Sequence, residues 1–187
     1  MGTRQIWRAL MALRKAAKRL HRDERGVSAV EFALIAPVMI VILFGVIEIS
    51  QLFAADRKVT RTTSTVADLV AQDDIITADE MTDIFTASGA IMQPYDTAGL
   101  QMRVSSVVMD DKGKVAVDWS EGRNMSPRAP GSVVSVPAGI LQTNTSVIMA
   151  EVSYNYTSTL GTFLSTPIKL GETFYLRPRR ALKVKGP

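Results

Sequence analysis

An uninterrupted apolar segment near the N-terminus constrains this chain most. The sixteen residues between Glu31 and Glu48 carry no charge. Counted from Val27 to Ile47, the apolar segment has 21 residues. As an α-helix it would be about 31 Å long, close to the ~30 Å hydrocarbon core of a bilayer. The sequence therefore predicts a single membrane-spanning helix over residues 27–47.

A cleavable secretory signal is the competing interpretation of this segment. Signal peptidase sites carry small residues and follow an apolar core of roughly 7–15 residues. The run here is longer, and its nearest pair of small residues, Ala54-Ala55, follows Leu52-Phe53. An anchor is therefore favoured. Pro37 and Gly45 lie inside it, as both residue types often do in membrane helices, and Pro37 is expected to kink the helix.

Glu31 is the unusual residue of the segment. A carboxylate at bilayer depth costs roughly 2.5–3.5 kcal/mol on insertion scales, so Glu31 must lie near the headgroups or have a partner. One interpretation is that it only marks the cytoplasmic edge of an ordinary anchor. The order of the neighbouring sequence features favours another interpretation. A basic segment comes first, then Gly26, then five residues that end in Glu31, and then the apolar run.

This arrangement resembles the type IV prepilin processing site, in which cleavage follows the glycine. The resemblance implies a cut between Gly26 and Val27 that leaves Glu31 as the fifth residue of the mature chain. The new amine at Val27 would have an ordinary pKa near ~8 and be largely cationic at neutral pH. It would then pair with Glu31 of a neighbouring subunit inside the membrane.

The longer string that begins Glu31-Phe32-Ala33-Leu34-Ile35-Ala36-Pro37 resembles the TadE-like family, which comprises TadE-, TadF- and TadG-like pilus assembly proteins. The resemblance covers residues 22–56 and is weaker beyond. In the major Flp pilin, which is far shorter, tyrosine follows the glutamate, whereas this chain has Phe32. The resemblance implies a minor pilin-like (pseudopilin) assembly protein of a bacterial tight adherence (Flp) pilus, located in the inner membrane. Its implied partners are other pilin-like subunits, the secretion machinery, prepilin peptidase and membrane lipid.

Positive charge is concentrated before the apolar segment. Eight of the 22 Lys and Arg residues lie in the first 25 positions. By the positive-inside rule this leader, residues 1–26, stays in the cytoplasm and the C-terminal part is periplasmic or extracellular. Three basic residues soon after the segment do not reverse the balance. The leader itself is either a basic amphipathic helix on an anionic membrane surface or a solvated basic tail.

The helical pattern continues beyond the predicted membrane span. Apolar residues recur at spacings near 3.5 or 7 over residues 48–72, which predicts a stalk helix that ends at Asp73-Asp74. Its partner is either the sheet of its own domain or another pilin-like helix. The sequence Thr77-Ala78-Asp79-Glu80 is typical of a capping box and predicts a second short helix that ends near Gly89.

From residue 100 the pattern changes to strands. Residues 101–109 and 114–119 predict a β-hairpin around the Asp110–Gly113 turn, and residues 145–156 and 173–180 predict two more strands. Residues 121–139 contain three prolines and predict a long surface loop. The predicted fold is α+β: the helical stalk, then an extracytoplasmic domain over residues 73–187 with a small antiparallel sheet that packs one face on helix. A calcium site at the adjacent aspartates is less favoured than a plain turn.

The chain offers little for catalysis. Its one histidine, His21, lies in the leader, it has no cysteine, and no glycine-rich phosphate loop follows a strand. We therefore predict a protein that is not an enzyme, with no cofactor and no metal. Aromatic and basic residues alternate near the C-terminus, but packed and solvated strand faces explain them better than nucleic-acid binding. The rival function is a membrane-anchored periplasmic binding or structural domain that takes no part in a pilus.

Overall fold

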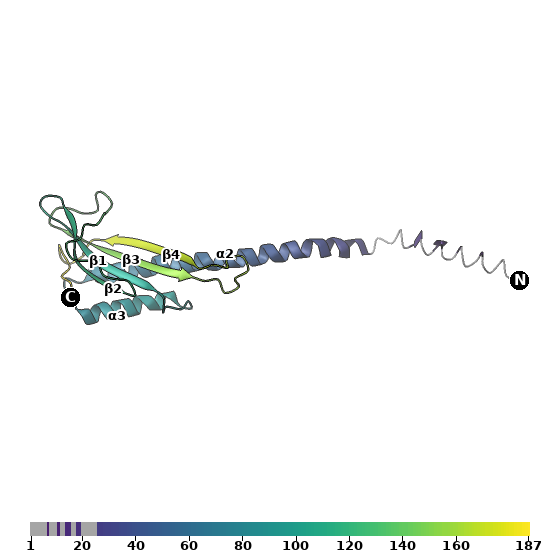
Figure 1. Ribbon diagram of the computed structural model, residues 1–187, viewed down its shortest axis with the longest axis horizontal. Helices are drawn as coiled ribbons and strands as arrows, with labels where there is room; N and C mark the ends of the chain where they lie inside the picture. Colours follow the sequence, from purple (N-terminus) through teal and green to yellow (C-terminus); the bar gives the residue numbers. More distant parts are fainter. Residues whose placement is uncertain (1–6, 8–10, 12–13, 16–17, 20–25) are drawn as a thin grey trace. The chain divides into compact units, whose positions relative to one another are not determined.

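The computed structural model describes residues 7, 11, 14–15, 18–19 and 26–187 (Figure 1). The prediction that the leader forms an amphipathic helix or a tail therefore falls mostly outside the described residues. The chain divides into two units, residues 1–46 and residues 47–187, and each is described by itself.

The first described element is helix α2, Val27–Gln72, which is 46 residues long. It continues through Pro37 and ends directly before Asp73. In the unit of residues 47–187, its buried residues include Ala55, Val59, Val66 and Val70, at the spacing that places side chains on one helix face. They belong to the same core cluster as strand residues, so this part of the helix packs on the sheet of its own chain.

Helix α3, Ala78–Gly89, begins with the predicted capping box. The backbone N–H of Glu80 donates to the Thr77 hydroxyl at 3.3 Å, and the backbone N–H of Thr77 donates to the Glu80 carboxylate at 2.8 Å. These two bonds satisfy donors that a helix N-terminus otherwise leaves open. The 3-10 turn η2, Ala90–Met92, follows α3 directly. The capping-box prediction and the predicted end near Gly89 are both confirmed.

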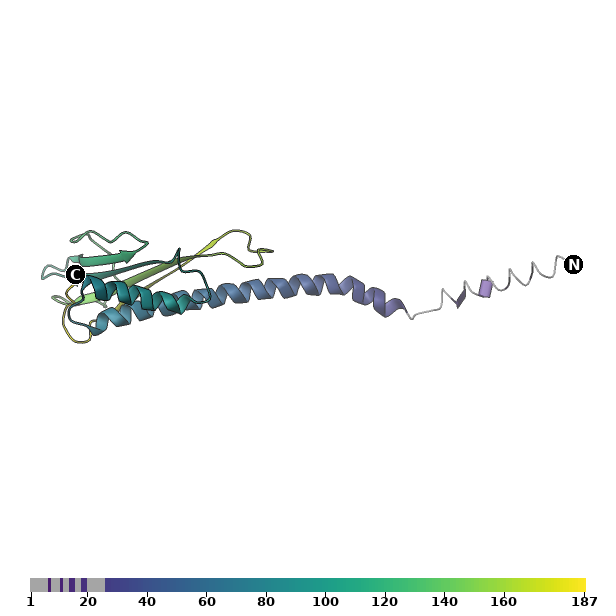
Figure 2. The ribbon, with the colours of Figure 1, turned by 90° about the horizontal axis from the view of Figure 1, so that it is seen from below.

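Four antiparallel strands form one sheet in the order β2-β1-β3-β4 (Figures 1 and 2). Their bounds are β1 Gln101–Met109, β2 Val115–Arg123, β3 Ser146–Tyr156 and β4 Ile168–Leu176. With the long N-terminal helix and one further short helix, this confirms the predicted α+β fold class.

Two strand boundaries differ from the prediction. Strand β2 runs to Arg123, because its last residues pair with the start of β1, so residues 121–123 are not loop. Strand β4 starts at Ile168, which pairs with Tyr156, and ends before the predicted 173–180 strand would. As an edge strand, β4 has mostly exposed residues. Gly171 and Glu172 interrupt the apolar alternation that Ile168 and Leu170 begin, so the pattern by which a strand is recognised is short.

The sheet is covered on both faces. On one face, α2 and α3 contribute to the main core with Met102, Ile148 and Val152 of the strands. On the other face, Val147 and Met149 form a second, smaller cluster. Residues from the proline-rich connection between β2 and β3, among them Leu141, Val134, Val136 and Ile140, complete this cluster. The predicted packing of one sheet face on helix is therefore confirmed, and the predicted surface loop also covers the other face.

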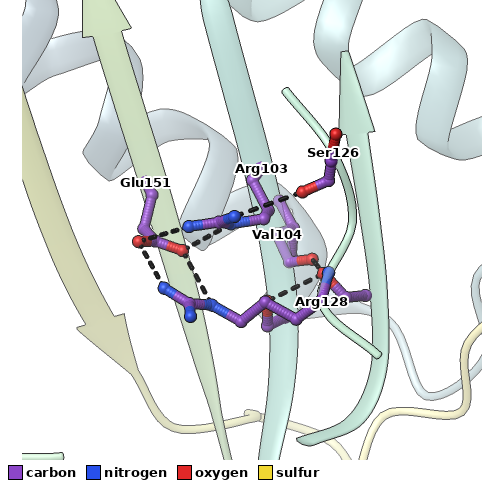
Figure 3. Close-up of polar contacts among 7 residues, drawn as sticks. Arg103, Val104, Ser126, Arg128 and Glu151 are labelled. Atoms are coloured by element: carbon purple, nitrogen blue, oxygen red, sulfur yellow. Dashed lines mark hydrogen bonds and ion pairs between the residues drawn. The ribbon is translucent and has the colours of Figure 1, made fainter. Parts of the chain in front are cut away.

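An ion-pair cluster fixes the start of this connection (Figure 3). The carboxylate of Glu151 accepts from Arg103 Nε at 2.8 Å and Nη2 at 2.9 Å, and from Arg128 Nη2 at 2.8 Å. Burial would raise the pKa of Glu151, but the hydrogen bonds and positive charges of the two arginines outweigh it and lower that pKa. Arg103 also donates to the backbone carbonyl of Ser126. The cluster therefore holds residues 126–128 against the sheet.

Candidate functional site

The residues of the predicted processing site lie at the start of α2. Gly26 directly precedes the helix, Val27 is its first residue, and Glu31 lies one turn further on. A Cβ atom added at Gly26 would meet no atom within 4 Å. The fold therefore has room for a side chain at this position and does not itself require glycine there. The side chains of Val27 and Glu31 are exposed. Their pairing between neighbouring subunits stays a prediction, as does the kink at Pro37.

The helix that follows presents large apolar side chains on all its sides. Exposed fractions include 70% at Phe32, 71% at Leu34 and 60% at Ile42. A helix that is apolar all round requires an apolar environment. In the described part of the chain, α2 is the one helix long and apolar enough, by length and composition, to cross a membrane. These properties suggest a membrane anchor.

A buried carboxylate follows the apolar stretch and was missed by sequence reasoning, in which Glu48 was only the end of the uncharged run. The structure buries this side chain completely. Its Oε1 accepts a hydrogen bond from the backbone N–H of Thr162 at 2.6 Å. Its Oε2 accepts from the backbone N–H groups of Phe163 and Leu164, both at 2.9 Å. Three successive amides that converge on one carboxylate form an anion-binding nest.

The loop between β3 and β4, residues 157–167, supplies this nest. Gly161 adopts a φ of 62°, a left-handed conformation that glycine tolerates without steric cost. It directly precedes the three amides that point at Glu48. Leu164, the last of the three residues that bind Glu48, also packs against the main core. This contact fixes the loop at that residue. We call this arrangement, Glu48 with residues 161–164, the Glu48 clamp.

The clamp keeps Glu48 ionised. Burial by itself would raise the pKa of this carboxyl group. The backbone hydrogen bonds from Leu164, Thr162 and Phe163, together with the Ser158 hydroxyl, outweigh burial and lower the pKa below the ordinary value of 4.5. The three backbone amides that bind Glu48 lie more than 110 positions away in the sequence, and no local sequence motif predicts them.

We expect the replacement of Glu48 with glutamine to lower the thermal unfolding midpoint at neutral pH, because an amide NH₂ would then face backbone donors. The lowered pKa means that the folded state binds fewer protons than the unfolded state. The stabilisation by Glu48 is therefore complete above about pH 4.5 and is lost as the pH falls through the folded-state pKa. Thermal melts of the full chain in detergent, across this pH range, measure the effect.

Glu172→Gln is the matched control, since Glu172 is an exposed carboxylate on β4. This variant should melt close to the wild type at every pH. A difference between wild type and Glu48→Gln that stayed constant far below pH 4.5 would contradict the role of the charge.

Other candidate chemistry finds ordinary structural explanations. Asp110 accepts hydrogen bonds from the backbone N–H groups of Lys112 and Lys114, and Gly113 has a φ of 78°. The predicted turn at Asp110–Gly113 is therefore confirmed. A calcium site had been the alternative interpretation of these aspartates. Near the C-terminus, Arg177 donates to a backbone carbonyl and Arg179 pairs with Asp68 of α2. Across the described residues, there is no group of three or more potential metal-ligating side chains.

Comparison with known proteins agrees with the start of the chain. The model of the family described as "TadE-like protein" matches residues 26–68, which confirms the predicted resemblance over this stretch. The match begins at Gly26 and includes Glu31, the apolar stretch and Glu48. No curated protein and no solved structure matches the chain.

Proposed function

From the similarity of residues 26–68 to TadE-like proteins, we propose that this protein is a minor pilin-like (pseudopilin) assembly protein of a bacterial tight adherence (Flp) pilus. The observation that carries the proposal is that the matched stretch contains both the glycine–glutamate pattern and an apolar helix surface left uncovered by protein. In this function the protein works by non-covalent helix packing and catalyses no reaction.

In this function, processing creates a partner for Glu31. Prepilin peptidase cuts between Gly26 and Val27 and leaves a cationic amine on Val27. That amine pairs with Glu31 of a neighbouring pilin-like subunit, and the pair carries less net charge into the apolar environment than the carboxylate alone. The exposed apolar side chains around Glu31 then pack against lipid or against the neighbouring helix. Removal of the leader and subunit association are thereby linked.

The protein sits in the bacterial inner membrane with its N-terminus in the cytoplasm. The basic residues of the leader support this orientation through the positive-inside rule. Residues 48–187 then lie in the periplasm or outside the cell, where the sheet domain meets other pilin-like subunits and the secretion machinery. Nucleic acid has no part in this function.

Intact-mass measurement of the protein extracted from its native membrane tests the proposal. We expect a mature chain that begins at Val27, because the peptidase leaves the residue after Gly26 as the new N-terminus. A full-length chain would contradict processing and favour the rival function, a membrane-anchored periplasmic domain outside any pilus.

A further inference from the structure

The loop held by the Glu48 clamp presents two large apolar side chains to the outside. Leu160 is 44% exposed and Phe163 is 50% exposed. The neighbouring Leu164 is partly buried and packs against the core, so the loop directs one apolar residue to the core and leaves two uncovered. A single exposed leucine on a protein surface needs no explanation. Two large apolar side chains on a loop that a buried carboxylate fixes in place do need one.

The position of the loop in the fold indicates what covers these side chains. The pair Tyr156 and Ile168 closes the loop at one end of the sheet. The β1–β2 turn lies at the opposite end, since Val108 pairs with Ser146 at the start of β3 (Figure 1). Glu48, which binds the loop, directly follows Ile47, the last residue of the predicted membrane span. Because the loop binds Glu48, it lies next to the point where the chain emerges from the predicted membrane span.

Further exposed groups on the same part of the domain suit a bilayer interface. Ile49 and Phe53 are 50% and 58% exposed, and their spacing of four residues places them on one face of α2. Arg57 follows one turn later and Lys169 follows the loop, and both are exposed. Protein segments at the bilayer interface bury Phe and Leu side chains at the boundary between headgroups and acyl chains, and long basic side chains reach the headgroups.

We propose that the β3–β4 loop is a second membrane contact of this protein, in which Leu160 and Phe163 enter the headgroup boundary of the bilayer that α2 spans. The Glu48 clamp holds the loop in the conformation that exposes these two side chains. The proposal rests on the membrane anchoring included in the proposed function, but not on any role in a pilus.

Single cysteines in this cysteine-free chain allow a direct test. The full-length protein is reconstituted in vesicles of phosphatidylethanolamine and phosphatidylglycerol, with a nitrobenzoxadiazole dye at one position and spin-labelled lipid as quencher. The test position is Phe163→Cys, with Leu160→Cys as a second probe of the same loop. Val41→Cys, inside the predicted span, is the control for anchoring. Val133→Cys is the matched surface control, because Val133 is 72% exposed and bridges to Ala116 at the opposite end of the sheet.

We expect strong quenching at position 41, intermediate quenching with a blue-shifted emission at positions 163 and 160, and no quenching at position 133. Adding Glu48→Gln should reduce the quenching at position 163 towards that at position 133, while position 41 stays quenched. A dye that partitions into lipid by itself would stay quenched in this variant. Loss of quenching at position 163 therefore shows that the clamp holds the loop at the membrane.

The contrary outcomes are distinct. Positions 163 and 160 that behave like position 133, while position 41 is quenched, would overturn the loop contact and leave anchoring intact. Leu160 and Phe163 would then be assigned to contact with a protein neighbour. An unquenched probe at position 41 would overturn both the anchoring and the loop contact.

Discussion

Replacing Glu31 with leucine will abolish incorporation of this protein into complexes with other pilin-like subunits while leaving it in the membrane. The substitution removes the carboxylate that the Val27 amine of a neighbouring subunit is proposed to bind. The free energy of membrane insertion should become more favourable, since leucine replaces a charge. The limit is about 3 kcal/mol, which is the value for a residue at the centre of a membrane helix. Pull-down of pilin-like subunits and counting of pili measure the loss, and membrane fractionation measures insertion.

Val30→Leu is the matched control for this variant. It introduces the same residue at the preceding position, which is 61% exposed, and it keeps the carboxylate. This control should assemble as the wild type does. If Glu31→Leu also assembled normally, Glu31 would be only a marker of the membrane boundary, and the proposed pairing would be excluded.

Replacing Gly26 with tryptophan will leave the leader attached to essentially all of the protein. A bulky side chain should not fit where the peptidase accepts glycine. The change should not disturb the chain itself, because a Cβ at Gly26 meets no atom within 4 Å. The mass of the membrane-extracted protein should therefore be that of the full-length variant. It should still insert, because the apolar run is unchanged.

Gly99→Trp provides the control for a bulky residue in place of glycine. Gly99 is also exposed, and a Cβ there likewise meets no atom within 4 Å. This variant should be processed as the wild type is. Cleavage of Gly26→Trp at the normal position would remove the prepilin-type interpretation of the leader.

Features determined by neighbouring residues could be predicted from the sequence. The length of the apolar run predicts a helix that can span a membrane, and α2 has the required length and composition. The capping box at Thr77 and Glu80 involves residues three positions apart. The Asp110–Gly113 turn is equally local. In each case the stabilising partner lies within one turn of the chain, so that the pattern of residue types is sufficient.

Features that depend on distant partners came only from the tertiary structure. Strand β4 begins at Ile168 because Tyr156 is its partner, and Gly171 and Glu172 interrupt its apolar alternation after Leu170. The proline-rich connection covers the sheet because Leu141 packs against Val147 and Met149 on its outer face. Composition alone favours a solvated loop there, since prolines and glycines mark loops without indicating what they cover.

Glu48 shows the same division at the candidate site. The sequence shows that a carboxylate ends the uncharged run, that Gly26 and Glu31 have prepilin-like spacing, and that the segment between Glu31 and Glu48 is apolar. The burial of Glu48 and its bonds to three amides of a loop more than 110 residues away are visible only in the folded chain. The physical reason is that backbone amides are common to almost every residue. Their convergence on one carboxylate depends on the path of the folded chain. No local pattern of side chains indicates it.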